Sequence, residues 1–552
     1  MTTPTRTLNQ LLLENEKQRG DKIYLRQPRE GRWHEFSWAV VIRQARQVAR
    51  FLQDAGLKKG DHVAIFSKNC AEWFITDFGI SLAGMVSVPL FANQHQESIK
   101  YVLEHAEAKL VFVGKLDDHQ RVRGYIPQDF ITVSFGYHDN LNTTYLWTDV
   151  LNKEPLQEVV LPSPDDLYTI IYSSGTSGQP KGAVYTHGIT ANYLSLFPED
   201  IKRIRVLDHY HLLSYLPLAH VYERSAIQLG SITIPSDVSF VESLDKFADN
   251  LREVQPTFFA AVPRIWGVFQ QKIEQKLPPS RLNILLKIPF ISSLIKNKIR
   301  HHLGLNRCTN CFSGASHLPV SILNFFDKLD IKIQEGYGQT ENLAYATFSM
   351  LDKRRPGYVG TPRLQVEVKL ADENELMIKS PCLMKEYYKN KEATSAALTK
   401  DGWLHTGDIA ELDENNNVKI VGRLSENFKN QKGEFIIPAP IEKRFAMNSD
   451  IEQLCMVGRE LPNNVLVITL SESGQEQSKE NIKQSLQENL RKVNSELASY
   501  EKISHVIIAK KPWTTENGFL TPTLKVKRRL VETNYHDVIQ GAITQPDTIV
   551  WE

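Results

Sequence analysis

Cysteine is scarce in this chain, with five residues among 552. A sparse, odd-numbered set does not build the dense disulfide framework of a small secreted scaffold, and it is typical of a reducing compartment. The opening segment MTTPTRTLNQLLLENEKQRGDK becomes charged at once and lacks the apolar core of a secretory signal. We therefore expect a cytoplasmic protein.

An excess of charge of either sign is also missing, because 65 Lys and Arg face 64 Asp and Glu. A net charge of +1 exerts no global attraction on nucleic acid or acidic lipid, so we expect no nucleic-acid partner. Apolar residues make up 41% and charged residues 23%, which excludes a disordered or collagen-like chain. Any anionic ligand must be held by local groups.

No long uninterrupted hydrophobic run is present. The most apolar stretch covers residues 73–92, but it contains Asp77, two glycines and Pro89. A membrane span needs about 20 consecutive apolar residues. This stretch therefore predicts a buried helix that runs into a strand.

The first part of the chain alternates helix and strand patterns. Val41, Ala45, Val48 and Leu52 recur at helical spacing, Gly56 ends that helix, and the strand-like DHVAIF follows. A helix from Ala71 and a strand around 86–88 complete a β-α-β unit, and strand-like runs recur at 109–113, 168–172 and 257–262. At this length we expect an α/β fold, with a large N-terminal body of several subdomains built on mostly parallel sheets.

The composition changes after about residue 423. Residues 425–433 are polar and contain glycine, which predicts a linker or exposed loop. Beyond it, strand-like runs at 465–470 and 504–509 flank a helix with one apolar face, formed by Ile482, Leu486, Leu490, Val493 and Leu497. We predict an N-terminal domain of residues 1–423 and a small, mobile α+β lid domain of residues 424–552.

The segment 168–187 carries the clearest chemical signal. An apolar run ends in a Ser, Thr and Gly loop, followed by Pro180, Lys181 and Gly182. Small residues let backbone N–H groups approach a polyphosphate, and the lysine supplies a cation; a flexible turn is the plain alternative. A P-loop would need glycine at Pro180, and a dinucleotide fingerprint at 336–341 would need glycine at Glu341, so both are excluded.

The loop resembles the signature of the adenylate-forming (AMP-binding) superfamily, which includes acyl-CoA synthetases, luciferases and the adenylation domains of peptide synthetases. Further segments are similar to that family's motifs and follow in its order: SYLPLAHVYER (214–224), FSGASHLP (312–319), QEGYGQTE (334–341), GYVGTP (357–362), DGWLHTGDIAELDE (401–414), GRLSENFKNQKGEFIIP (422–438) and TPTLKVKR (521–528). The first and last have the form of the long-chain fatty acyl-CoA synthetases. The ordered set is far more specific than any one match.

The resemblance implies a two-step reaction with ATP, Mg²⁺ and CoA. A fatty acid and ATP would give acyl-AMP and pyrophosphate, and a thiol would then displace AMP. Bringing a carboxylate to a triphosphate places like charges together, and one pair about 4 Å apart repels by about 4 kcal/mol at an effective dielectric constant near 20. The site should therefore contain fixed cations and a metal ion.

By the same resemblance, one set of residues would hold the nucleotide phosphates and the metal. Lys181 would contact the leaving pyrophosphate, and Glu341 with Ser173 would hold Mg²⁺. Thr340, Tyr337 and Gly338 would lie along the adenosine and α-phosphate. The other residues expected to bind the nucleotide in these two segments are Ser174, Gly175, Thr176, Ser177, Gly178, Glu335 and Gly336.

A second set would hold the sugar and base and carry out the chemistry. Asp408 would accept the ribose hydroxyls, Arg423 would contact ribose or phosphate, and Gly314, Ala315 and Ser316 would border the adenine. Lys525 would bridge the acyl carboxylate and the α-phosphate, and a basic surface run is the alternative for it. Gly433 would face the pantetheine arm, and the small domain would rotate about residues 424–426, with Glu426 at the hinge.

Several residues allow two interpretations. His220 would lie at the carboxylate end of the acyl pocket or be a core histidine. Cys308 and Cys311 are expected to be buried strand residues rather than metal ligands. Residues 282–300 combine apolar and basic side chains, and Pro289 predicts two surface helices, with a peripheral membrane contact as the alternative.

Three functions fit the pattern. A long-chain fatty acid–CoA ligase is the first, because the acceptor segment around Gly433 and the His220 segment resemble the CoA-using branch. An acyl-AMP ligase that loads a carrier protein is the second, and a silent adenylate-binding protein is the third. The joint presence of Lys181, Glu341, Asp408 and Lys525 argues against the last. Chain-length preference and oligomeric state stay open.

Overall fold

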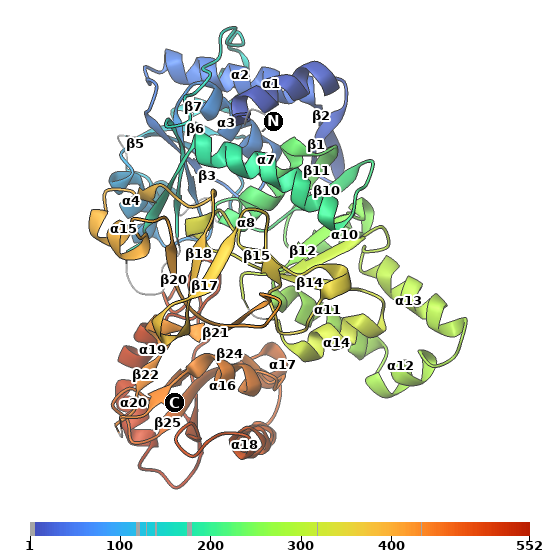
Figure 1. Ribbon diagram of the computed structural model, residues 1–552, viewed down its shortest axis with the longest axis vertical. Helices are drawn as coiled ribbons and strands as arrows, with labels where there is room; N and C mark the ends of the chain where they lie inside the picture. The colour runs from blue at the N-terminus through green and yellow to red at the C-terminus, as the bar shows by residue number, and fades with distance from the viewer. Residues whose placement is uncertain are drawn as a thin grey trace.

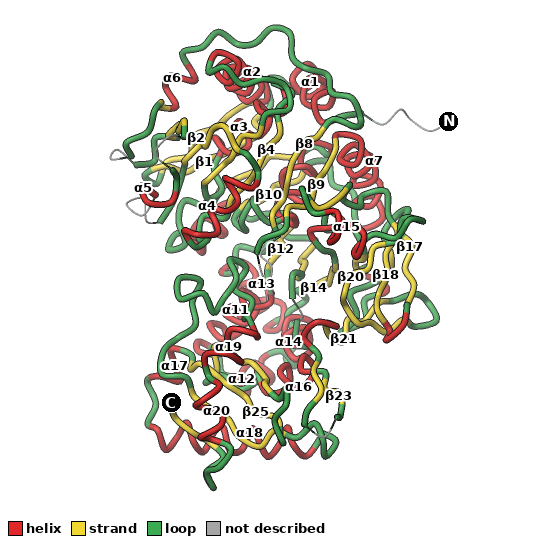
Figure 2. Tube along the Cα trace, turned by 90° about the vertical axis from the view of Figure 1, so that its left-hand side faces the viewer, coloured by secondary structure: helices red, strands yellow, loops and turns green. Residues whose placement is uncertain are grey.

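The computed structural model describes residues 6–117, 122–127, 130–138, 141–173, 179–316, 318–431 and 433–552. Figure 1 shows a large body that contains the N-terminus and a smaller C-terminal domain, and the turned view of Figure 2 keeps the two apart. Among the described residues, no helix combines the length and apolarity needed to cross a bilayer.

One sheet of the body has eight strands and is mostly parallel, with antiparallel pairs only at β8–β9 and β9–β19. Its spatial order is β19 (Glu386–Tyr387), β9 (Gly182–Thr186), β8 (Leu167–Tyr172), β4 (Val86–Leu90), β3 (His62–Phe66), β5 (Ala108–Val113), β6 (Ile131–Ser134) and β7 (Tyr145–Leu146).

The predicted β-α-β unit is present in this sheet. Helix α2 (Trp38–Asp54) buries Val41, Ala45, Val48 and Leu52 completely. Strands β3 and β4 pair in parallel, and helix α3 (Ala71–Leu82), which is buried along its whole length, connects them. The apolar stretch 73–92 is therefore a buried helix followed by a strand, as its composition predicts.

A second sheet has nine strands, and its central pairs are parallel. Its order is β16 (Thr361–Pro362), β15 (Thr347–Phe348), β14 (Ile333–Tyr337), β13 (Asn310–Ser313), β12 (Phe258–Ala261), β10 (Tyr210–Ser214), β11 (Ser236–Phe240), β1 (Ile23–Arg29) and β2 (Arg32–Ser37). The predicted strands at 168–172 and 257–262 thus belong to different sheets.

Further helices of the body connect these strands. They are α1 (Leu8–Arg19), α4 (Gln96–His105), α5 (Val122–Tyr125), α6 (Trp147–Leu151), α7 (His187–Ile204), α8 (Val221–Glu223), α9 (Gly230–Thr233), α10 (Phe247–Val254), α11 (Pro263–Lys276), α14 (Val320–Lys328) and α15 (Lys391–Ala397). A four-stranded antiparallel sheet, β17 (Glu367–Leu370), β18 (Glu375–Lys379), β20 (Leu404–Leu412) and β21 (Val418–Arg423), leads to the C-terminal domain.

The C-terminal domain is built on β24 (Ile451–Val457), β25 (Asn464–Leu470), β26 (Ile503–Ile508) and β27 (Ile549–Trp551). Successive side chains of a strand point to opposite faces, and here both faces are covered. Leu466 and Ile468 pack with α16 (Pro438–Phe445) and α18 (Lys479–Ser495), whereas Val465 and Val467 pack with α19 (Arg528–Asn534) and α20 (His536–Ala542). Short α17 (Glu472–Gln475) follows β25.

The predicted exposed linker at 425–433 is wrong in part. Asn427, Phe428 and Asn430 are buried, and the segment forms a 3₁₀ turn, Leu424–Glu426, and a hairpin of β22 (Phe428–Lys429) and β23 (Phe435–Ile436). Phe428 packs directly against Gly458, where an added Cβ would lie 2.4 Å from the ring. The polar composition of the segment did not indicate that Phe428 is buried and anchors it to the C-terminal domain.

Residues 282–300 form two helices, as the position of Pro289 predicts. They are α12 (Pro279–Leu285) and α13 (Ile291–His302), and they project from the body beside α14 (Figure 1). Phe290, between them, is 88% exposed. Cys308 and Cys311 are both buried, with Cys311 on β13 and Cys308 just before it.

Candidate active site

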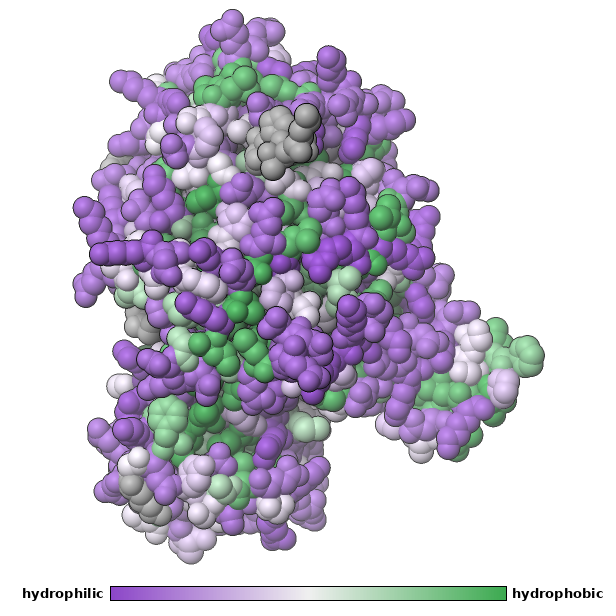
Figure 3. All heavy atoms as spheres, in the orientation of Figure 1, coloured by the Kyte–Doolittle hydropathy of each residue, from purple (hydrophilic) through white to green (hydrophobic). Residues whose placement is uncertain are grey.

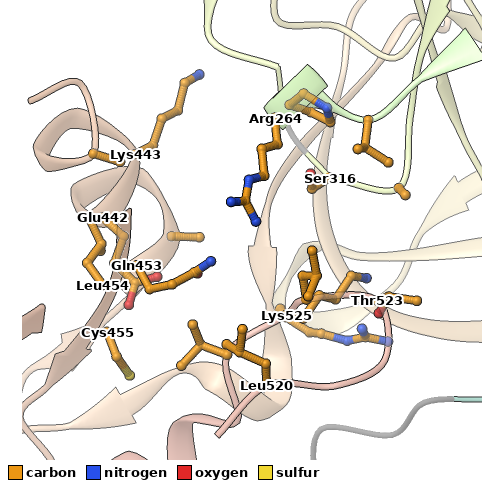
Figure 4. A pocket seen from close by; sticks show the side chains of 18 of the residues that line it. Arg264, Ser316, Glu442, Lys443, Gln453, Leu454, Cys455, Leu520, Thr523 and Lys525 are labelled. Atoms are coloured by element: carbon orange, nitrogen blue, oxygen red, sulfur yellow. The ribbon is translucent and has the colours of Figure 1, made fainter. Parts of the chain in front are cut away.

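A cleft of about 2730 Å³ lies between the body and the C-terminal domain. Its walls contain residues that are far apart in the sequence, including Lys181, Glu341, Asp408 and Lys525. Figure 4 shows part of it, with Lys525 from the C-terminal domain and Ser316 from the body around the same space, and Arg264 reaching into it. The sequence motifs therefore converge on one cavity.

The first wall is formed by described residues at the facing ends of β8 and β9. These strands pair antiparallel, and the Ser173 N–H donates to the Lys181 carbonyl at 2.9 Å, so the loop closes a hairpin. Ser173 and Lys181 line the cleft, and the ammonium of Lys181 lies 5.2 Å from the centre of the Tyr387 ring. The predicted phosphate-binding residues Ser174, Gly175, Thr176, Ser177 and Gly178 lie outside the described residues.

The second wall follows β14, where Gly336, Tyr337, Gly338, Thr340 and Glu341 line the cleft. A Cβ on Gly338 would lie 2.6 Å from the backbone of Ala344, so only glycine fits there. The Tyr387 hydroxyl donates to Glu341 Oε1 at 2.6 Å, and the Tyr185 hydroxyl donates to the Thr340 carbonyl. The carboxylate of Glu341 is thereby fixed at the cleft.

Asp408 is held from three sides. The Tyr337 hydroxyl and the Gln339 amide nitrogen each donate to its Oδ2 at 2.6 Å. Arg423 lies directly opposite on the paired strand, with Nε 3.4 Å from Oδ1. This cross-strand pairing of β20 and β21 explains why two residues fifteen positions apart act at one point.

Lys525 enters the cleft from the loop before α19, where Leu524 has a left-handed backbone with φ of 61°. The side chain is exposed to solvent within the cleft, and the protein atoms around it lower its pKa by partial desolvation. The positive charge of Arg423 lowers it further, and Asp408, Glu426 and Glu341 oppose that shift. These neighbours place the Lys525 ammonium in the same part of the cleft as Asp408, Arg423 and Glu341.

His220 lies at the cleft wall, and its ring nitrogen Nδ1 accepts the N–H of Tyr222 at 3.3 Å. Burial lowers its pKa to about 4, with a further contribution from Lys525, so the imidazole is neutral at pH 7. Arg224, four residues later, is fully buried and paired with Asp77 at 2.6 Å, which fixes this segment to α3.

Some expected site residues lie elsewhere. Glu335 is 4% exposed and does not line the cleft; its Oε2 accepts the Gly357 N–H at 3.3 Å, and burial raises its pKa to about 7. Ala315 and Ser316 line the cleft, whereas Gly314 does not. Gly433, with φ of 80°, sits in the β22–β23 turn and is not part of the cleft wall.

Four cleft residues had no role assigned from the sequence, although two of them, Gln339 and Arg528, lie inside recognised motifs. Gln339 and Tyr387 hold Asp408 and Glu341, and Arg264 pairs with Glu452 of the C-terminal domain at 2.6 Å. Arg528 is not the surface cation that the basic run predicts, because it is mostly buried and pairs with Glu442 at 2.7 Å. Gln339 stood inside a recognised motif, whereas Tyr387 carried no sequence signal.

Two family models match the chain. The AMP-binding enzyme model covers residues 12–388, and the AMP-binding enzyme C-terminal domain model covers residues 429–546. The first spans more than half of the chain.

Curated relatives cover most of the chain at low identity. Long-chain-fatty-acid–CoA ligase 5 of Mus musculus is 28% identical over 89% of this chain and 82% of its own length. Fatty acyl-CoA synthetase A of Dictyostelium discoideum is 27% identical, with 92% and 85% covered. Long-chain-fatty-acid–CoA ligase FadD15 of Mycobacterium bovis is 26% identical, with 96% of both chains covered.

Solved structures share the fold. The A domain of a carboxylic acid reductase from Segniliparus rugosus, bound to AMP and a carboxylic acid, superposes with a TM-score of 0.81 at 20% identity, covering 99% of this chain and 95% of that one. The o-succinylbenzoate CoA synthetase of Bacillus subtilis, bound to an acyl-adenylate, gives 0.75 at 18%, covering 95% and 97%. With both family models matched in order, this chain belongs to the AMP-binding, adenylate-forming enzymes.

Proposed function

We propose that this enzyme activates a long-chain fatty acid with ATP to acyl-AMP and then transfers the acyl group to CoA. One observation carries the proposal: Lys181, Glu341, Asp408 and Lys525, separated by up to 344 positions, line one cleft. The long-chain substrate rests on the names of relatives at 26–28% identity that cover most of the chain.

In the first half-reaction, a carboxylate oxygen would bond to the α-phosphorus while the bond to pyrophosphate breaks. Lys525 would hold the two anions together, and Lys181 would accept the leaving pyrophosphate. Asp408, already hydrogen-bonded by Tyr337 and Gln339, would orient the ribose. Fixed charges of this kind stabilise the transition state because they need no reorganisation during the reaction.

Mg²⁺ would be held at Glu341, with Ser173 as a second oxygen donor. Both residues line the cleft, and carboxylate and hydroxyl oxygens are donors that suit this ion. When bound, the ion would neutralise part of the triphosphate charge. Tyr387 would position the Glu341 carboxylate through its hydrogen bond.

In the second half-reaction, the CoA sulfur would bond to the acyl carbon while AMP leaves. Gly433 lies outside the present cleft, so the C-terminal domain would have to turn to present it. The short segment Leu424–Glu426 joins β21 to the β22–β23 hairpin and is the proposed hinge. Domain rotation about a few residues at an element end is a common device. The domain boundary at 423/424 is proposed on the same grounds.

A panel of fatty acids of different chain lengths tests the proposal. The purified chain is incubated with ATP, Mg²⁺ and each acid, and pyrophosphate and acyl-CoA are measured with and without CoA. Pyrophosphate together with acyl-CoA for long acids is the expected result. Pyrophosphate without thioester would identify the carrier-protein ligase, and neither product would identify the silent binder.

We also propose that α12 and α13 make a peripheral contact with an anionic membrane, which would give access to a lipid-dissolved substrate. Their tip exposes the apolar side chains of Ile284, Phe290 and Leu294, and Figure 3 shows hydrophobic atoms gathered on this projection. Four basic residues lie on the same segment: Lys287, Lys296, Lys298 and Arg300. Apolar anchors among cations are typical of interfacial helices.

Flotation with anionic and neutral vesicles tests this contact. The fraction bound to anionic vesicles should fall after charge reversal at those four positions and after Phe290→Ser. Binding that is unchanged by both sets would contradict the proposed contact.

A further inference from the structure

A cluster of two histidines and one aspartate lies on the nine-stranded sheet, away from the cleft. Strands β10 and β11 run parallel, and His211 lies directly opposite Asp237. His209 lies just before β10, and its imidazole meets the same carboxylate as that of His211. His209 Nε2 and His211 Nδ1 each lie 2.7 Å from Asp237 Oδ1.

Only one oxygen of the Asp237 carboxylate contacts the two histidines. Asp237 is 6% exposed, and among the described residues its Oδ2 is buried without a hydrogen-bond partner. A buried polar atom without a partner destabilises the folded protein, and a bound ligand can remove that cost. The two imidazoles remain about one-third to one-half exposed, so solvent and ions reach the cluster from one side.

The spacing suits a small ion. The three potential ligand atoms lie within 4.8 Å of one another. A tetrahedral Zn²⁺ with bonds of about 2.1 Å separates its ligand atoms by about 3.4 Å, so each histidine nitrogen would have to move only about 0.7 Å from the Asp237 oxygen, 2.7 Å away. Imidazole and carboxylate form a donor set that suits Zn²⁺ and its neighbours in the first transition row.

We propose that His209, His211 and Asp237 form a binding site for a divalent transition-metal ion, with Zn²⁺ as the preferred ion and solvent completing its coordination. The site is distinct from the nucleotide cleft. None of its three residues lines that cleft, and they lie at the amino ends of β10 and β11, whereas His220 follows the carboxyl end of β10. The ion would join two neighbouring strands.

Calorimetric titration of the chelator-treated full chain with Zn²⁺, without nucleotide, tests the site. We expect one ion per chain, with at least tenfold weaker binding in His209→Ala, His211→Ala and Asp237→Asn. The partly exposed His209 makes its variant the least disruptive to folding. Zn²⁺ should also raise the melting temperature of the wild-type protein and not that of the variants.

Two matched controls make the result specific. The exposed neighbours His301 and His302 on α13 provide a double alanine variant that removes two histidines outside the site, and it should bind Zn²⁺ as the wild type does. Cys308→Ser tests the buried thiol pair, whose sulfur atoms lie 3.5 Å apart. Zn²⁺ binding that is absent in the wild type, unchanged by the three site variants or abolished by Cys308→Ser would overturn the proposal.

Discussion

Lys525 is the residue whose position says most about the chemistry. It belongs to the C-terminal domain, yet Asp408 and Glu341 of the body act on its charge. Such an arrangement is suited to holding two anions at the moment when they react, because a fixed cation is most valuable where charge concentrates.

Replacement of Lys525 tests this role. Lys525→Ala should slow acyl-AMP formation by about 10²–10³-fold, the usual cost of one preorganised charge-stabilising group. It should affect thioester formation from supplied acyl-AMP much less. Lys527→Ala, in the same basic run, is the matched control and should leave both steps nearly unchanged. Equal losses in the two variants would assign Lys525 to the surface run.

Glu335 gives a pH prediction. Its folded-state pKa of about 7 exceeds the unfolded value of about 4.5, so the folded state holds the proton more tightly and loses stability as the pH rises through this window. Glu335→Gln keeps the acceptor for the Gly357 N–H and removes the ionisation. The melting temperature of the variant, relative to the wild type, should therefore increase between pH 4.5 and pH 8.

The opposite trend, or a raised KM for ATP in Glu335→Gln, would place this carboxyl at the nucleotide after all. Its burial behind the cleft wall argues for the stability effect alone.

At the scale of elements, much of the fold could be predicted because local patterns agree with the tertiary structure. The predicted face of α2 is buried, and so is that of α18 except for Leu497, which lies beyond the end of the helix and is half-buried; the apolar runs at 168–172 and 257–262 form strands. The linker could not be predicted correctly, since the burial of Phe428 depends on Gly458, thirty residues later.

The candidate site could also be predicted only where a local motif marks the residue. Motif residues such as Asp408 and Lys525 were recognisable, and they lie in the cleft. Tyr387 was not, because its partners Glu341 and Lys181 come from other elements and nothing local marks it. Glu335 stood inside a motif but does not line the cleft, because it is buried and its Oε2 accepts the Gly357 N–H instead, a contact that nothing local in the sequence marks.

A substitution in the proposed hinge, Leu424–Glu426, tests whether the C-terminal domain rotates there. Glu426→Pro fixes one backbone angle in the segment and should impair thioester formation more than acyl-AMP formation. Glu426→Ala serves as the control, because it removes the 3.8 Å ion pair with Arg528 and leaves the backbone free. Equal loss of both half-reactions in the proline variant would argue against a hinge.

At the scale of the whole molecule, the two domains are joined across the cleft by Arg264 and Glu452. Both side chains are at least one-third exposed, and such surface pairs contribute about 0.2–1 kcal/mol. Glu452→Arg should therefore slow acyl-AMP formation by about 1.4–5-fold by disfavouring this domain arrangement. The charge swap with Arg264→Glu should restore the rate; a swap that restores nothing would exclude this contact as a clamp.

The central claim is that distant segments of the chain assemble one adenylate-forming site. Exchange of labelled pyrophosphate into ATP, measured with a long-chain fatty acid and without CoA, tests it most directly. Our account predicts exchange that requires the fatty acid, is present in wild type, and falls at least a hundredfold in Lys525→Ala. Exchange that is absent in the wild type, or equal in the two proteins, would contradict it.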